Sequence, residues 1–194
     1  VLTSVSSSGN DEHVLVGDRI EILGDQHLVA EVDIKDNSRD LRITMSYLDE
    51  FFNDDSSVAL GIDLDLVVIS PDKTVYRGNQ RVDNTEEMFS TNERVIIKKE
   101  ELKPGKYEIH VISHIPEIVT EKSVMFSVTV FGPISDTAKE MITFSKAKEC
   151  IPVVDGHGKC NKETTLNECI FDDMEAYTGH SCQNEAVVII DSSK

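Results

Sequence analysis

The sequence contains no tryptophan, and aromatic residues make up only 6% of its 194 positions. Basic residues are also scarce, because 19 lysines and arginines stand against 36 aspartates and glutamates, for a formal net charge of −17. A chain this acidic is repelled by phosphate backbones, so we expect no nucleic acid partner. No apolar run approaches the roughly 18 residues that cross a bilayer, so we expect no membrane span within this chain.

Motifs for catalysis and nucleotide binding are missing as well. The sequence has no G-x-S-x-G, no G-x-x-x-x-G-K-[ST] and no G-x-G-x-x-G. These motifs place a serine nucleophile or wrap backbone N–H groups around phosphates, so their absence argues against both chemistries. We therefore expect no enzyme activity and no nucleotide cofactor from these residues. Because the chain begins at Val1 without a signal-like segment, we expect it to be a piece of a longer precursor.

Cysteine is absent from the first 149 residues, and all four cysteines fall in the last 45: Cys150, Cys160, Cys169 and Cys182. An even number crowded into one short segment predicts two disulfides, and with them an extracellular or secretory-pathway location. Zinc binding is the alternative. It has less support, because there is no C-x-x-C pair and only His157 and His180 lie nearby.

What the sequence does contain is a period of two. Between residue 13 and about Gly132, apolar and polar residues alternate in short segments such as HLVAEVDI, LRITMSYL, DLDLVVI, KYEIHVI and VMFSVTVF. Turn-forming pairs such as Pro71-Asp72, Gly78-Asn79 and Pro104-Gly105 separate these segments. Short strands at this spacing, without helical segments between them, predict an all-β fold, an antiparallel β-sandwich or jelly roll.

Four regions follow from this pattern. We expect a lead-in and first strand over 1–24, a β-sandwich over 25–132, a linker over 133–149, and a disulfide-rich module with its tail over 150–194. The segment 133–149 has a mixed composition that also suits a short helix or a further strand. The last region has few large apolar side chains, so we expect its order to depend on the disulfides.

Two acidic residues in one strand are the candidate metal ligands. Asp63 and Asp65 project from one strand face, while Leu64 and Leu66 project from the other. This face is an open charged stripe, or donors of the protein hold the carboxylates, or they share a Ca²⁺ with Asp83, Asn84 or Glu86. Calcium takes six to eight oxygen ligands, often from loops. Ca²⁺ is thus the one cofactor that the sequence suggests.

His110 and His114 form a second pair of candidate ligands. Their spacing of four puts both side chains on one face of a strand. No third ligand stands in register with them, so we interpret them as surface or interface histidines.

The order of these signals resembles a known family. The segments LRITMSYLDE, LGIDLDLVVISPDKTVYRGN, NERVIIKKEELKPGKYEIHVIS and VMFSVTVFG are similar to the C-terminal jelly-roll domain of large subtilisin-like serine proteases. The resemblance covers roughly residues 25–132. The matching positions, in order, are Asp49, Asp63, Leu64, Asp65, Leu66, Pro71, Gly78, Asn79, Glu93, Val95, Gly105 and Tyr107.

The resemblance implies an appendage of a protease. The aspartate, histidine and serine motifs of the subtilisin catalytic domain are absent, so the expected role is non-catalytic: to support folding and stability of the catalytic domain of the same precursor, and to contact its substrates. It also implies that Gly78, Asn79 and Glu93 form a structural turn. The sequence departs from the family pattern at Tyr47, where a tryptophan is usual, and at Ile62, Ser90 and Thr91, where asparagines are usual.

The cysteine segment is similar to the latter part of an EGF-like module, although it has four cysteines instead of six. This resemblance implies disulfides Cys150–Cys160 and Cys169–Cys182. The alternative function is a free-standing extracellular binding or adhesion module, either lectin-like or protein-binding, which has kept the jelly roll without a protease.

Overall fold

The computed structural model describes residues 13–48, 63–79, 90–114, 123–135, 141–152, 157–169, 176–178, 182 and 184–186. Over these residues the chain forms strands joined by turns and loops. The strands are β1 (His13–Leu23), β2 (His27–Ile34), β3 (Leu41–Tyr47), β4 (Asp63–Ile69), β5 (Val75–Arg77), β6 (Asn92–Ile97), β7 (Gly105–His114), β8 (Ser123–Gly132), β9 (Ser145–Lys146), β10 (Gly158–Asn161), β11 (Leu166–Cys169), β12 (Ala176–Thr178) and β13 (Asn184–Ala186). The described residues include no helix with the length and apolarity to cross a membrane.

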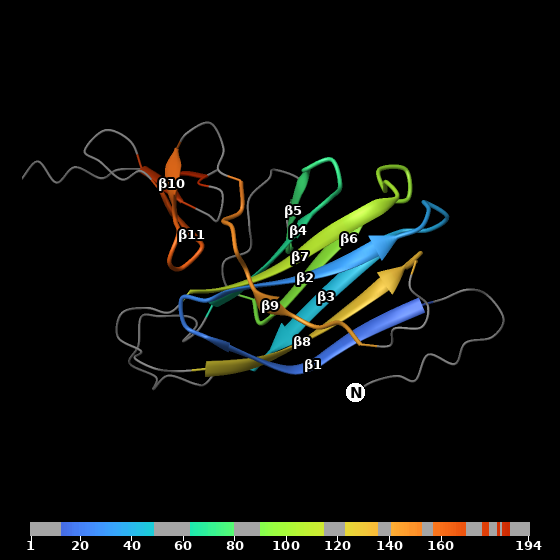
Figure 1. The fold of residues 1–194 in the computed structure, drawn as a ribbon, viewed down its shortest axis with the longest axis horizontal. Coiled ribbons are helices and arrows are strands. Elements are labelled where there is room, and N and C mark those ends of the chain that lie inside the picture. Colours follow the sequence, from blue (N-terminus) through green and yellow to red (C-terminus); the bar gives the residue numbers. More distant parts are fainter. Residues whose placement is uncertain are drawn as a thin grey trace, which may run out of the picture.

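Strands β1 to β8 form an antiparallel jelly roll. One sheet has the order β1-β8-β3-β6, and the facing sheet has the order β5-β4-β7-β2, extended at its edge by β9 (Figure 1). Successive strands therefore fall mostly in opposite sheets, as in an eight-stranded double Greek key. The predicted all-β sandwich is confirmed. β1, predicted as a first strand ahead of the sandwich, is one of its edge strands.

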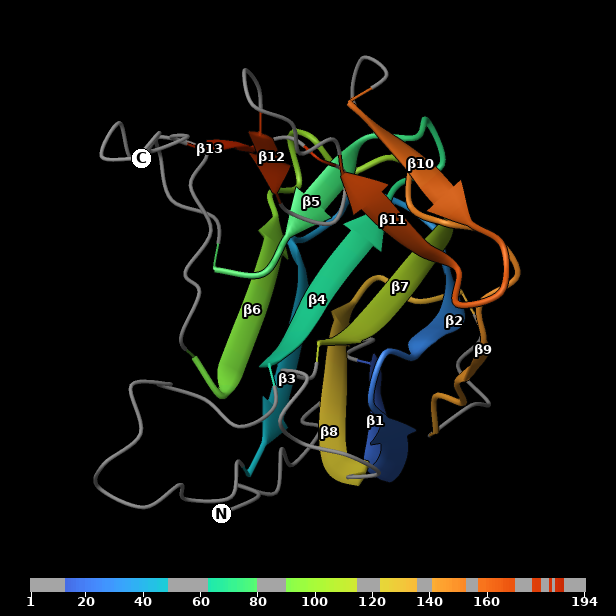
Figure 2. The ribbon, with the colours of Figure 1, turned by 90° about the vertical axis from the view of Figure 1, so that its left-hand side faces the viewer.

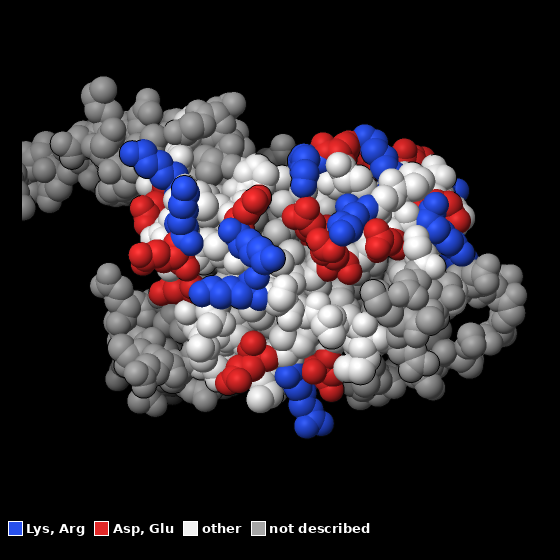
Figure 3. Space-filling model, viewed as in Figure 1, with Lys and Arg blue, Asp and Glu red and all other residues white. Residues whose placement is uncertain are grey.

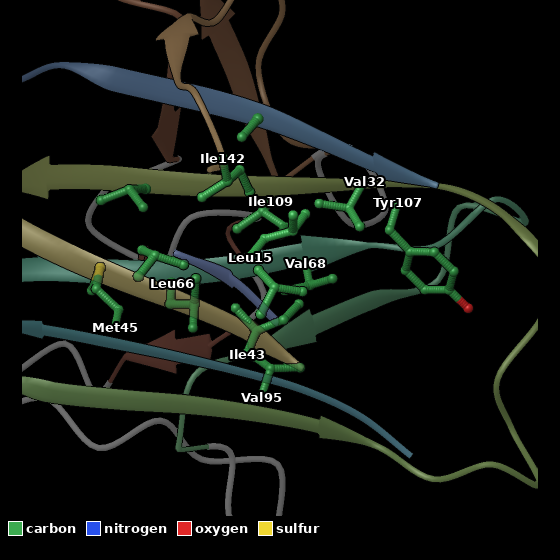
Figure 4. Close-up of a cluster of buried hydrophobic side chains, with 14 of the residues drawn as sticks. Leu15, Val32, Ile43, Met45, Leu66, Val68, Val95, Tyr107, Ile109 and Ile142 are labelled. Atoms are coloured by element: carbon green, nitrogen blue, oxygen red, sulfur yellow. The ribbon is translucent and has the colours of Figure 1, made fainter. Parts of the chain in front are cut away.

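The alternation in sequence becomes an alternation of burial. In β3 every second side chain, from Leu41 to Tyr47, is buried, and β8 follows the same pattern. The buried members of both sheets meet between them, where Ile43, Leu66 and Ile109 interdigitate (Figure 4). A strand that buries one face gains from apolar side chains at alternate positions, which is why the period-two pattern locates these strands.

Strand β4 departs from simple alternation. Its first half alternates, whereas Val67, Val68 and Ile69 are all buried. Leu66 and Val68 belong to the main core, while Val67 and Ile69 belong to a second, smaller cluster with Ile112 and Ile151. The second half of β4 is therefore buried on both faces, because a further part of the chain covers the outer face of its sheet.

The segment 133–149, predicted as a linker, contributes to the sandwich in its described parts. Ile134 and Ile142 are buried in the main core. Ile134 bridges Ile34, and the N–H of Ile142 donates to the carbonyl of Val16 on β1. Strand β9 then pairs with Leu28 and Val29 of β2. The segment thus lies alongside the edge strands β1 and β2, at one open side of the sandwich.

The cysteine-rich module lies on the outer face of the five-stranded sheet. Its hairpin β10–β11 lies beside β7 and β4 in both ribbon views (Figure 2), and Leu166 packs against the cluster of Val67, Ile69 and Ile112. Two disulfides, Cys150–Cys160 and Cys169–Cys182, cross-link the module. They follow the pairing that the EGF-like resemblance implies, and none of the four cysteines is free.

Candidate functional site

The first candidate site is the seam where β4 faces the opposite sheet. β4 pairs with β7 along its whole length, but with β5 only from Val67 to Ile69. Two side chains of the other sheet serve the N–H groups ahead of that pairing. The N–H of Leu66 donates to Oε2 of Glu93 at 2.6 Å, and the N–H of Leu64 donates to Oη of Tyr47 at 3.3 Å. Side-chain acceptors therefore continue the ladder that β5 leaves incomplete.

Gly78 and Asn79 complete this seam. The N–H of Gly78 donates to the carbonyl of Leu66 at 2.7 Å. Asn79, at a φ of 50°, binds β6 three times: its N–H donates to the carbonyl of Arg94, its Nδ2 donates to the carbonyl of Asn92, and its Oδ1 accepts from the N–H of Arg94. Asparagine is one of the few residues that adopt this left-handed conformation readily.

Glycine is required at position 78 because of Glu93. A Cβ atom there would lie 2.1 Å from Oε2 of Glu93, far inside van der Waals contact. Glu93 itself is only 3% exposed. Gly78, Asn79 and Glu93, separated by up to 15 positions in the sequence, are thus one structural unit that joins the two sheets. We name these three residues, with Tyr47, the seam cluster.

The acidic pair lies elsewhere. Asp63 and Asp65 are half-buried on the outer face of β4, opposite His114 and Ile112 of β7. The amide of Asn79, in the turn after β5, is bonded to β6. Asp83 lies outside the described residues. Within the described ranges, no three His, Cys, Asp or Glu side chains gather closely enough to hold a metal ion. The calcium site at Asp63, Asp65 and Asp83 stays a prediction.

The second candidate site is a pair of buried histidines beneath the cysteine module. His27 begins β2 and His110 lies in β7, and both project from the outer face of the five-stranded sheet. Nε2 of His27 lies 2.8 Å from Nδ1 of His110, and Nδ1 of His27 lies 3.0 Å from the carbonyl oxygen of Thr165. Thr165 belongs to the turn between β10 and β11. The histidine pair therefore bonds the module to the sandwich.

The surroundings of His110 oppose its protonation. Burial, followed by the neighbouring His27, lowers the pKa of His110 from 6.5 to about 4, although Glu108 acts in the opposite direction. Nε2 of His110 faces the Glu108 carboxylate at 3.4 Å and makes no hydrogen bond. Taking a charge out of water costs more than one partly exposed carboxylate returns, so the neutral form dominates.

A groove of about 1020 Å³ runs past the His110 end of the histidine pair. Charged side chains of both signs line it, among them Lys73, Glu108 and Lys146. Figure 3 shows the same mixture over one whole face of the molecule, where lysines and arginines are interspersed with aspartates and glutamates. On this face the acidic excess of the chain is therefore partly balanced by local ion pairs, such as Lys73 with Glu108.

The sequence pattern predicted a surface or interface position for His110 but did not indicate His27. It paired His110 with His114 along one strand, whereas the true neighbour is 83 positions away. The available signal was weak: both histidines occupy outward positions of two strands that become neighbours only once the jelly-roll order is known. Thr165 offered no signal, because it contributes a backbone carbonyl.

Comparisons with known proteins add little. No protein-family model matches the chain, and no curated protein matches it either. Among solved structures, the VP2 subviral particle of infectious bursal disease virus is similar at 12% identity and a TM-score of 0.37, over 76% of this chain and 41% of that one. The structure of the Gx strain of the same virus gives 10% identity and a TM-score of 0.34, over 72% and 36%. The chain thus spans well under half the length of these proteins.

Proposed function

We propose that this chain is a non-catalytic C-terminal accessory region of a secreted or surface subtilisin-like serine protease, which supports the folding and stability of the catalytic domain and contacts its substrates. The observation that carries the proposal is the seam cluster. Three motif positions that resemble the family lie together here: Gly78 and Glu93 contact each other and Leu66 of β4, and Asn79 bonds β6, the strand that carries Glu93. A motif whose scattered members form one contact network is a stronger basis for kinship than the same letters without contacts.

The disulfides are compatible with the extracellular location that this function requires. They do not by themselves distinguish a protease appendage from an adhesion module, since both classes are exported. Fold alone does not make that distinction either.

The two sheet faces suggest how the accessory region would bind its catalytic domain. The module covers part of the outer face of the five-stranded sheet, whereas the other sheet exposes the apolar side chains of Leu23, Ile96 and Met125, and that of Leu48 just after β3. Met125 pairs with Glu21 on β1, and Leu48 follows Tyr47, which is opposite Phe126. Continuing the β3–β8 register by one residue places Leu48 opposite Met125, and with Leu23 they form what we call the apolar corner. We assign it to the contact with the catalytic domain.

The coding sequence upstream of Val1 is the first test. A serine-protease G-T-S motif, preceded by the aspartate and histidine motifs, supports the proposal. An upstream region without these motifs contradicts it and favours the free-standing binding or adhesion module.

A second test uses the whole precursor. We expect Leu48→Glu with Met125→Glu to reduce the yield of folded protease that a fluorophosphonate probe labels, because two charges would be buried at the contact. The matched control is Thr44→Glu, at an exposed position of the same face of β3. An unchanged yield for the double variant, with the sandwich still folded, would remove the apolar corner from the proposal.

A further inference from the structure

The hydrogen bonds around the two histidines fix where their protons lie. A carbonyl oxygen only accepts, so Nδ1 of His27 must carry the proton that it donates to Thr165. In neutral His27, Nε2 is then a bare acceptor, and Nδ1 of His110 must donate to it. Neutral His110 accordingly has no proton on Nε2, the atom that faces Glu108. Both neutral rings are therefore Nδ1–H tautomers, and the Thr165 carbonyl of the module determines both of these protonation sites.

A positive charge on this pair is opposed by burial and not by a lost hydrogen bond. One proton stays between the two rings, and the added proton lies on Nε2 of His110, where it faces Glu108. His110 is only 4% exposed, so the charge is held largely out of water. When the module is absent from this face, both rings lie on an open sheet surface and each can take a proton from water.

We propose that His27 and His110 form an acid-sensitive latch, which holds the cysteine module on the sandwich at neutral pH and releases it as the pH falls. Release separates the β10–β11 turn, with the Thr165 carbonyl and Leu166, from the outer face of β2, β4 and β7. Among the described residues, the apolar cluster of Val67, Ile69 and Ile112 also contacts the module there. The segment through Cys150 keeps the module tethered.

Charged groups on several elements around the latch influence whether His110 takes up a proton. From β7, Glu108 favours protonation of His110. From β2, His27 opposes it, and so does Lys73 from the turn between β4 and β5. The passing segment contributes Lys146, Lys148 and Glu149 to the same groove, and β2 contributes Glu31. One carboxylate near the ring is thus outweighed by burial and by the neighbouring ring.

The sign of the effect follows from linkage. The pKa of His110 is lower in the docked state than when exposed, so the undocked state binds more protons. Docking is complete above the exposed pKa of 6.5 and weakens as the pH falls from 6.5 toward about 4. For this one histidine, the docking constant at pH 5 is about 30-fold lower than at pH 7.5.

Nuclear magnetic resonance on the full, isotope-labelled chain tests the latch. Long-range ¹H–¹⁵N correlations in the imidazole rings report the tautomers, and we expect both rings as Nδ1–H at pH 7.5. Methyl contacts between Ile112 and Leu166 report docking, and we expect them to weaken between pH 7.5 and 5 together with protonation of His110. An Nε2–H tautomer in either ring, a charged ring at pH 7.5, or contacts of full strength at pH 5 would overturn the proposal.

Two variants separate titration from structure. In the double variant His27→Asn, His110→Asn, each amide retains a donor near the original Nδ1, but neither side chain titrates. We expect docking in this variant to be equal at pH 7.5 and 5. The control His13→Asn, on β1 of the other sheet, should keep the wild-type pH dependence. If the double variant does not dock at all, the wild-type titration decides: contacts that are lost before either ring gains a proton contradict the latch.

Discussion

The sandwich and the cysteine module obtain their order by different means. The sandwich buries a continuous set of apolar side chains between two sheets, with Ile43, Leu64, Val68 and Ile109 all fully buried. In the described part of the module the strands have three or four residues, and the buried residues are Ile151, Thr165 and Cys182. A small apolar interior cannot offset the conformational entropy that the chain loses on folding. The disulfides and the contact with the sandwich therefore supply the remaining stability of the module. We therefore expect the module to depend on the sandwich for its order, and the sandwich to fold without the module.

Loss of a core side chain should have the largest effect and should act on the whole molecule. Ile109 is fully buried between the sheets. We expect Ile109→Ala to lower the free energy of unfolding by about 2–5 kcal/mol, through lost apolar burial and the cavity left behind. Urea denaturation followed by circular dichroism measures this. Leu166→Ala, at the edge of the small cluster, serves as the comparison, and we expect it to loosen the module without lowering the stability of the sandwich.

Loss of one disulfide should have a smaller and local effect. Cys150 and Cys160 are ten positions apart, and the loop they close is short. We expect Cys150→Ala with Cys160→Ala to destabilise the module by about 2–3 kcal/mol, because the open module gains conformational freedom. Limited proteolysis should then cut within 150–182 while the sandwich stays intact. Equal loss of both regions would contradict the independence of the sandwich.

The seam cluster can be tested by coupling two substitutions. We expect Gly78→Ala to cost about 1–3 kcal/mol, because its Cβ would overlap the Glu93 carboxylate. The same substitution should cost less in a Glu93→Ala background, where that carboxylate is gone. Denaturant unfolding of the two single variants and the double variant gives the coupling energy. Strict additivity would show that Gly78 is not required by Glu93.

The smallest effect should come from surface ion pairs. Nζ of Lys106 lies 2.8 Å from Oε2 of Glu31, and both side chains are more than half exposed, at 53% and 57%. Water and salt screen such a pair, so we expect Lys106→Ala to change the free energy of unfolding only slightly. Thermal unfolding at low and high salt measures it. A larger loss would mean that the pair also fixes the register of β2 on β7.

The sequence predicted best where one local rule decides the structure. Period-two alternation located the strands around Leu41–Tyr47 and Ser123–Gly132 because each buries one face. It did not predict the burial of both faces of β4, since Val67 and Ile69 are covered by a module about 80 positions away in the chain. Nor did it show that Ile134 and Ile142 join the core, because their surrounding segment follows no clean period.

The candidate site divides in the same way. The family resemblance selected Gly78, Asn79 and Glu93, and their contacts explain why these residue types stand there. The histidine latch was missed, because its parts come from β2, β7 and the β10–β11 turn, and only the jelly-roll order brings them together. Side-chain pairs that depend on topology leave no trace in local spacing.

Native-state hydrogen exchange at pH 7.5, with increasing urea below the global transition, tests the difference between the two regions most directly. We expect two opening free energies: a lower one for the amides of β10 and β11, and a higher one, equal to the global value, for the amides of β3, β4 and β7. A single opening free energy shared by both sets would contradict the account, because it would mean that the sandwich and the module unfold as one cooperative unit.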